Sequence, residues 1–185
     1  MELTKVGAET ASWGNMRDGL SDRKARQYLR AVFDIMPLPA FIVREDVLVQ
    51  DFNKAAARFL GPSPELALER RGGEALHCLH AKGKECGRSA PCQDCVIRQC
   101  VNRALGGSAT HRQLHRAELE GEEGSKRIDL LVSALPLPGN DVPQALLVLE
   151  DVGDLLALRD LVPDCGQAPS VPGDPAILAP DWDRP

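Results

Sequence analysis

The sequence predicts an α+β fold, in which helices cover one face of a five-stranded antiparallel sheet. Two short apolar runs separated by a polar pair stand in the first third of the chain, and three longer alternating runs stand in the last half. Several short helical segments lie between these two groups. With 185 residues, 43% of them hydrophobic, the chain has enough apolar material for one core. Short antiparallel connections accommodate this order of elements.

The N-terminal part predicts a flexible arm over residues 1–20 and an amphipathic helix over residues 21–36. Pro37 and Pro39 end this helix, because proline cannot continue it. Its apolar residues recur at three- and four-residue spacing and form one stripe that needs a partner. The stripe consists of Ala25, Tyr28, Leu29, Val32, Phe33 and Met36.

A β-hairpin is predicted next, formed by AFIVR from Ala40 and VLVQDF from Val47 around the pair Glu45-Asp46. Asn53 has the residue type of a helix N-cap and precedes the short helical segment KAAARFL. Gly61-Pro62 ends that segment. The hairpin and its helix open the main domain, which we place at residues 37–153.

Three further helical segments are predicted before the remaining strands. PELALER starts at Pro64, GEALHCLH leads into a cysteine-rich insert at residues 78–95, and VIRQCVNRAL follows Cys95. Gly106-Gly107 closes the last of them. The insert therefore lies between helical segments, before the second group of strands.

Three strands complete the body: THRQLHRAEL from Thr110, RIDLLVSALPL from Arg127 and QALLVLEDV from Gln144. An exit helix is predicted at residues 154–162. The segment 163–185 has six prolines and little periodicity, so we expect it to be disordered.

Charge and hydropathy exclude several classes of function. The net charge of −5 gives no electrostatic reason to expect nucleic acid. No apolar run is long enough to span a bilayer, and the N-terminus lacks the apolar region of a secretory signal. We therefore expect a cytoplasmic protein without membrane attachment.

Three stretches of the chain resemble the PAS domain, a sensor module of signalling proteins, over about residues 28–153. PLPAFIVREDVLVQDFNKAAARFLG is similar to its opening hairpin and first small helix, and VLEDV is similar to its acidic strand exit. GEALHCLHAKGKECGRSAPCQDC resembles a cysteine-rich bacterial subset with Cys-x-His-Ala, Cys-Gly and Cys-x-x-Cys steps. The resemblance implies a PAS-like sheet and a sensory role. No kinase, cyclase or phosphatase sequence follows, so we expect output through a partner protein.

The four cysteines Cys78, Cys86, Cys92 and Cys95 are the candidate metal ligands. In a reducing compartment, cysteines crowded in this way indicate metal or redox chemistry, and a Cys-x-x-Cys pair directs two sulfurs at one metal. Gly83 and Gly87 let the loop wrap around the site. Lys82, Lys84 and Arg88 are expected to offset part of the thiolate charge.

Two metals compete for this site. Structural zinc sites favour two short cysteine knuckles, and only one such knuckle is present. An iron–sulfur cluster tolerates irregular spacing, and the resemblance adds weight to it because PAS sensors with oxygen-labile clusters are a known type. A site without metal, with buried or reactive thiols, is the third reading.

The other candidate residues have plain structural interpretations. His80 is the alternate ligand, although contact with solvent or with a backbone carbonyl is the favoured reading. Cys100 points away from Cys95 on its helix and is expected in the core. Cys165 is expected to be exposed in the tail. His111 and His115 would share one face of a strand, where two solvated histidines are the expected state.

The sequence thus predicts a non-enzymatic, cytoplasmic PAS-type sensor that responds to redox state or a diatomic gas and signals through a partner protein. We expect a homodimer formed through the terminal helices, with Leu155, Leu156, Leu158 and Leu161 on the second of them. One alternative is an adaptor or dimerisation module that is held together by a structural zinc site. A second is a thiol–disulfide oxidoreductase that uses Cys92 near a helix N-terminus.

Overall fold

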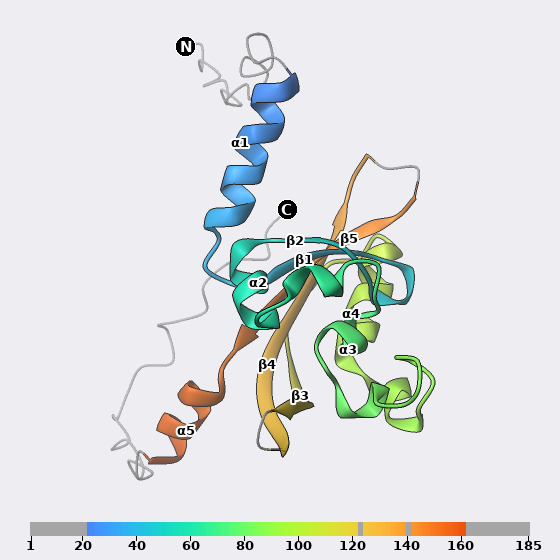
Figure 1. Cartoon of the computed structure of the whole chain (residues 1–185), viewed down its shortest axis with the longest axis vertical. Coiled ribbons are helices and arrows are strands. Elements are labelled where there is room, and N and C mark those ends of the chain that lie inside the picture. The colour runs from blue at the N-terminus through green and yellow to red at the C-terminus, as the bar shows by residue number, and fades with distance from the viewer. Residues whose placement is uncertain (1–21, 122–123, 140–141, 162–185) are drawn as a thin grey trace, which may run out of the picture. The chain divides into compact units, whose positions relative to one another are not determined.

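The computed structural model of the chain describes residues 22–121, 124–139 and 142–161. The predicted α+β class is confirmed, because five strands form one antiparallel sheet in the order β2-β1-β5-β4-β3 (Figure 1). The predicted arm, tail and Cys165 lie outside the described residues. The strands are β1 (Ala40–Arg44), β2 (Leu48–Phe52), β3 (Thr110–Gly121), β4 (Gly124–Leu137) and β5 (Gln144–Asp151).

Helices of different lengths precede, separate and follow the two groups of strands. The α-helices are α1 (Asp22–Ile35), α2 (Lys54–Leu60), α3 (Gly72–Ala75), α4 (Val96–Leu105) and α5 (Gly153–Leu161). Four 3₁₀ turns lie between them: η2 (Glu45–Val47), η3 (Pro64–Ala67), η4 (Leu79–Ala81) and η5 (Ala90–Asp94). The chain divides into two compact units between Val152 and Gly153, and α5 belongs to the second unit.

The core of the first unit lies where α4 packs on the sheet. Alternate residues of β4 and β5 are buried, as the period of two along a strand requires. Across the β4–β5 pair Val132 lies opposite Leu149, and Ala134 lies opposite Leu147. The buried face of α4 covers these side chains with Ile97, Cys100, Val101 and Ala104.

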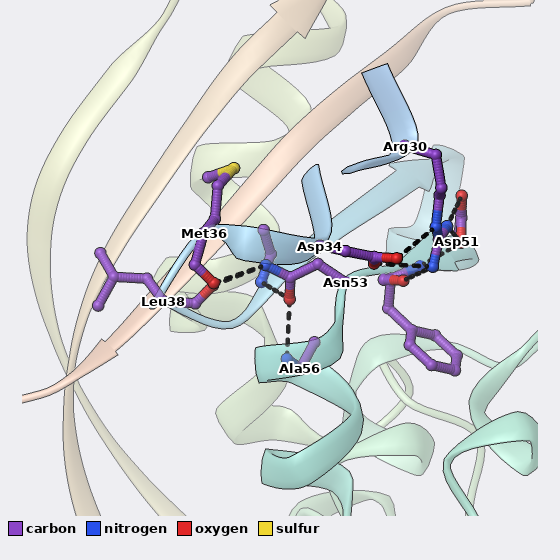
Figure 2. A network of polar contacts seen from close by, with 9 residues as sticks. Arg30, Asp34, Met36, Leu38, Asp51, Asn53 and Ala56 are labelled. Atoms are coloured by element: carbon purple, nitrogen blue, oxygen red, sulfur yellow. Dashed lines mark hydrogen bonds and ion pairs between the residues drawn. The ribbon is translucent and has the colours of Figure 1, made fainter. Parts of the chain in front are cut away.

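The Asn53 side chain joins three segments at the start of the domain (Figure 2). Its Oδ1 accepts the N–H of Ala56 at 2.8 Å, which caps α2, and the N–H of Ala40 at 3.1 Å, where β1 starts. Its Nδ2 donates to the carbonyls of Met36 and Leu38. The whole residue is 0% exposed, so these bonds satisfy a fully buried amide.

Helix α1 is tied to the first strands by one arginine. Arg30 forms an ion pair with Asp51 of β2 at 2.8 Å and donates to the Phe52 carbonyl, and it also pairs with Asp34 within α1 (Figure 2). Half of the predicted stripe is nevertheless exposed. Its exposed members, together with a neighbouring isoleucine, are Tyr28, Leu29, Val32 and Ile35.

Two segments predicted as helices are shorter than expected, which corrects the sequence analysis. The segment from Pro64 forms only η3, because Glu69 adopts a positive φ of 57°. The segment Gly73–His80 is helical only to Ala75, since His77 has a φ of 54° and turns the chain. L-residues rarely adopt this left-handed region, and a helix cannot continue through it.

Residues 69–78, which we call the strap, bind both edge strands of the sheet. At one end Val49 of β2 exchanges two backbone hydrogen bonds with Glu69 and Arg70. At the other end Glu120 of β3 donates its N–H to the His77 carbonyl at 2.8 Å. The strap therefore connects the two ends of the strand order, and its C-terminal residue is the first candidate ligand, Cys78.

None of the helices in the described part of the chain combines the length and the apolar character that a membrane span needs.

We predict that Asn53→Ala lowers the free energy of unfolding by about 3 kcal/mol, because it removes an N-cap and leaves buried backbone groups unpaired. Asn53→Ser keeps an N-cap acceptor and loses only the amide donors, so its effect should be smaller. Urea unfolding of the three proteins measures the difference. A loss below about 0.5 kcal/mol for the alanine variant would contradict the role of this side chain.

Candidate functional site

One cavity of about 280 Å³ brings the four predicted cysteines together. Its walls come from the start of α3, the cysteine loop, the start of α4 and the middle of β3. Apolar side chains make up much of the wall. The chemistry-bearing residues of the lining are Cys78, Cys86, Cys92, Cys95, His80, His115, Arg98, Arg116, Asp94 and Glu118.

Each cysteine reaches the cavity from a different local structure. Cys78 forms an isolated bridge with Leu119 of β3. Cys86 lies in the loop after η4, and Cys92 is in η5. Cys95 is the N-cap residue of α4. Cys92 lies near a helix N-terminus, as predicted, in the first turn of η5, while the N-cap position of the longer helix α4 belongs to Cys95.

Polar groups already point at each of the four sulfurs. The Cys78 sulfur accepts from the N–H groups of His80 and Ala81, and the Cys95 sulfur accepts from those of Ile97 and Arg98. The Cys86 sulfur accepts from the Gly73 N–H, and Ser89 Oγ lies 3.3 Å from Cys92 Sγ. Hydrogen bonds to an ionised sulfur are stronger than those to a neutral thiol, so the N–H groups favour thiolates. The Ser89 hydroxyl also donates to the His80 carbonyl.

Burial and mutual repulsion act against ionisation of three of the thiols. Burial raises the pKa of Cys78, Cys86 and Cys95, and the charges of the neighbouring cysteines raise it further. At Cys92 burial also acts to raise the pKa, but Ser89, the Gly87 N–H and the Arg98 charge outweigh it, and the pKa of Cys92 is lowered. The thiols influence one another, as groups around one small cavity must.

The thiols surround the cavity without converging on one point. Among the residues that the structure describes, no three His, Cys, Asp or Glu side chains are arranged to hold a single metal ion. Zinc in a four-cysteine site needs every sulfur at about 2.3 Å from one centre.

The two histidines that border the cavity differ in exposure, and only His80 has the solvated state that was predicted for it. His80 is exposed, in agreement with the solvated reading, but it also borders the cavity. Burial lowers the pKa of His115, and His80 lowers it further. A bulge between Thr110 and Gln113 interrupts the strand, so that His115 borders the cavity while His111 is exposed. The expectation of two equivalent solvated histidines is therefore wrong for His115.

The basic residues that border the cavity, Arg98 and Arg116, are not those expected. Lys82 is exposed and pairs with Glu120, Arg88 is exposed and pairs with Glu85, and Lys84 is exposed. None of these three borders the cavity, whereas Arg98 of α4 does. Sequence analysis missed Arg98 because a basic residue on an amphipathic helix is usually solvated.

Charged residues of α3 hold the loop around Cys86. Glu74 accepts the Cys86 N–H at 3.3 Å and reaches back to the Arg71 N–H, which makes it part of a capping box. Arg71 in turn donates to Glu85 at 2.8 Å and to the Cys86 carbonyl. The loop is thus anchored to the strap on both sides of the Cys86 sulfur.

Gly73 is a second residue that sequence analysis missed. A Cβ at this position would lie 2.7 Å from Cys86 Sγ and 3.2 Å from Cys86 Cβ. The absence of a side chain lets the sulfur approach the helix backbone and accept the Gly73 N–H. The signal was present only as a Gly-Gly pair, which predicts a break in a helix rather than a close approach.

Cys100 is 2% exposed in the core, as predicted.

A family model described as PAS domain matches residues 27–93, a range that includes three of the four cysteines. A comparison with curated protein sequences gives no match. Among solved structures, an RNA-binding light-oxygen-voltage receptor has a TM-score of 0.52 at 15% identity, and the alignment covers 86% of this chain and 41% of that one. At this identity the likeness shows the fold alone.

Two further structures are similar at lower scores. The PAS domain of an HTR-like protein from Haloarcula marismortui is 17% identical, with 70% of this chain and 93% of that chain covered and a TM-score of 0.48. The Rhodobacter sphaeroides LOV protein is 18% identical, with 71% and 69% covered and a TM-score of 0.47.

We predict that Gly73→Ala destabilises the protein by about 1–3 kcal/mol, although alanine is the better helix former, because the new methyl group overlaps the Cys86 sulfur. In a Cys86→Ala background most of this overlap is gone, so the same substitution should have a smaller effect. A double-mutant cycle of metal-free proteins by urea unfolding measures the coupling. Additive effects would show that the two residues are not in contact.

Proposed function

We propose that this chain is a PAS-type sensor protein whose Cys78, Cys86, Cys92 and Cys95 thiolates hold an iron–sulfur cluster. The match of a PAS domain model to residues 27–93 supports the sensory role. The signal would be redox state or a diatomic gas, and the output would pass through a partner protein. One observation carries the proposal: four thiols with preformed polar contacts border a single cavity of about 280 Å³.

The donor set favours a cluster over a single ion. Four cysteine thiolates are the usual ligands of iron–sulfur clusters. The sulfurs do not converge on one point, which supports an occupant larger than zinc. When bound, such a cluster exchanges single electrons and is sensitive to oxygen and nitric oxide.

The segments that carry the four cysteines would transmit a chemical change at the thiols to the rest of the domain. Cys78 ends the strap and Cys95 begins α4, so the four thiols join segments that pack on both β3 and the core. Release of the thiols on oxidation, nitrosylation or metal loss would free the loop between them. The strap and α4 would then lose a shared restraint, which is a local chemical change with a wider structural effect.

Zinc remains the alternative occupant, and with it the protein would be an adaptor held together by a structural site. It would require the four sulfurs to move toward one centre. For the dithiol oxidoreductase, the lowered pKa of Cys92 is the favourable observation. Against it stands the burial of Cys92, which hinders attack on a protein disulfide.

Anaerobic purification should yield a brown protein that contains iron and acid-labile sulfide and whose visible absorption bleaches in air. Alanine at Cys92 and Cys95 should remove the colour and most of the bound metal, because two of the four ligands are lost. Cys100→Ala is the matched control, since this buried cysteine lies in the core and does not border the cavity. Metal analysis, sulfide assay and absorption spectra measure all three proteins.

Other results would overturn the proposal in different ways. A colourless protein with stoichiometric zinc would identify the structural alternative. A protein with neither metal, and with all its thiols titratable, would leave a PAS adaptor without a metal site. Disulfide reductase activity that depends on Cys92 would identify the enzyme.

We further propose that the partner surface includes a homodimer contact through the apolar face of α1, with the exposed Leu155 and Leu158 of α5 as a second apolar surface. Leu29→Glu with Val32→Glu should convert a dimer to a monomer. Leu66→Glu is the control, because Leu66 is also an exposed leucine but lies outside α1. Analytical ultracentrifugation gives the masses, and a monomeric unsubstituted protein would exclude this dimer.

A further inference from the structure

Arg98 has one guanidinium nitrogen that no described group satisfies. Its Nη2 donates to Asp46 Oδ1 at 3.1 Å, but its Nη1 is buried and has no hydrogen-bond partner. The side chain as a whole is only 21% exposed and borders the cysteine cavity. A buried charged donor without an acceptor is strongly unfavourable, so the position of this nitrogen indicates a missing acceptor.

The loop between Cys86 and Cys92 approaches this guanidinium closely at Gly87. Gly87 has a φ of +93°, and a Cβ on it would lie 2.6 Å from Arg98 Nη1. Glycine therefore allows the arginine to lie directly against the loop between Cys86 and Cys92. The Arg98 charge reaches both thiols, since it acts to lower the pKa of each.

The other charged side chains of the cavity lining are Asp94, Glu118 and Arg116, and of these only Arg116 is a cation. Arg116 borders the cavity but is directed to Asp129 at 2.8 Å, and its side chain is 60% exposed. Four thiolates around one cluster or one zinc ion leave net negative charge in a partly buried site. Arg98 is then the buried cation of the described residues that is placed to balance it.

We propose that Arg98 is a positioning residue of the thiolate site, whose Nη1 donates a hydrogen bond to a ligand sulfur or to a cluster sulfide. Asp46 holds the guanidinium in place from the solvent side, and Gly87 makes room for it. This inference rests on the proposed function, because the acceptor is the sulfur of the bound group. Its effects are slower metal loss and a higher midpoint potential, since a nearby positive charge favours the reduced form.

Three variants, together with the conservative variant Arg98→Lys, separate this role from a merely structural one. Arg98→Gln removes the cavity cation and the ion pair with Asp46. Asp46→Asn removes the same ion pair, and with it the 3.7 Å ion pair between Asp46 and Arg71, but keeps the Arg98 cation. Asparagine tolerates the positive φ at this position. Arg116→Gln removes the other arginine of the cavity. Each protein is purified anaerobically and characterised by thermal unfolding without metal, metal loss to a chelator and midpoint potential.

For Arg98→Gln we expect metal loss about 10–100-fold faster than in the unsubstituted protein, as for other residues that orient metal ligands. Its midpoint potential should move to a more negative value. Arg98→Lys should restore part of both quantities, while Asp46→Asn and Arg116→Gln should stay near the unsubstituted protein.

The outcomes are distinguishable. If the unsubstituted protein binds metal and Arg98→Gln retains it equally well at an unchanged potential, the role of Arg98 is refuted and the proposed function stands. If Asp46→Asn loses metal as fast as Arg98→Gln, the ion pair to the fold is responsible and the Arg98 inference is again refuted. If the unsubstituted protein binds neither iron nor zinc, both proposals fail.

Discussion

The fold depends on one buried amide. Asn53 has to satisfy four hydrogen-bonding groups without water, and those groups belong to the segment before β1, to β1 itself and to α2. Because a buried amide is stable only when all its partners are in place, the three segments are held in one relative arrangement. The β1–β2 hairpin is thereby fixed beside β5, and the strap can pair with its outer edge.

The candidate site follows from that arrangement. The cavity has its wall in segments with little regular structure, and their positions are determined by side chains that bind backbone groups. Glu74 and Arg71 hold the loop at Cys86, and Gly73 admits its sulfur. A site built in this way can respond to chemistry at the thiols more readily than a site inside a helix or strand, because fewer backbone hydrogen bonds must break.

Much of the fold could be predicted from the sequence because local period and residue type decide it. Alternation along β4 and β5, the apolar face of α4 and the N-cap at Asn53 are all local signals. The early ends of the helices were not predictable, since Glu69 and His77 adopt positive φ angles without a glycine to indicate them. The spacing of the cysteines in the sequence predicted that they share one site. The roles of Arg98 and Gly73 could not be predicted, because they depend on contacts between distant segments.

The strap also limits how another chain can recognise this domain. An open sheet usually offers its outer strands to an extended peptide, which adds as a further strand through backbone hydrogen bonds. Here Val49 on one edge and Glu120 on the other already use their backbone groups on the strap. A binding partner that contacts the sheet near these residues must therefore recognise side chains rather than backbone, so its specificity would depend on surface composition more than on strand addition.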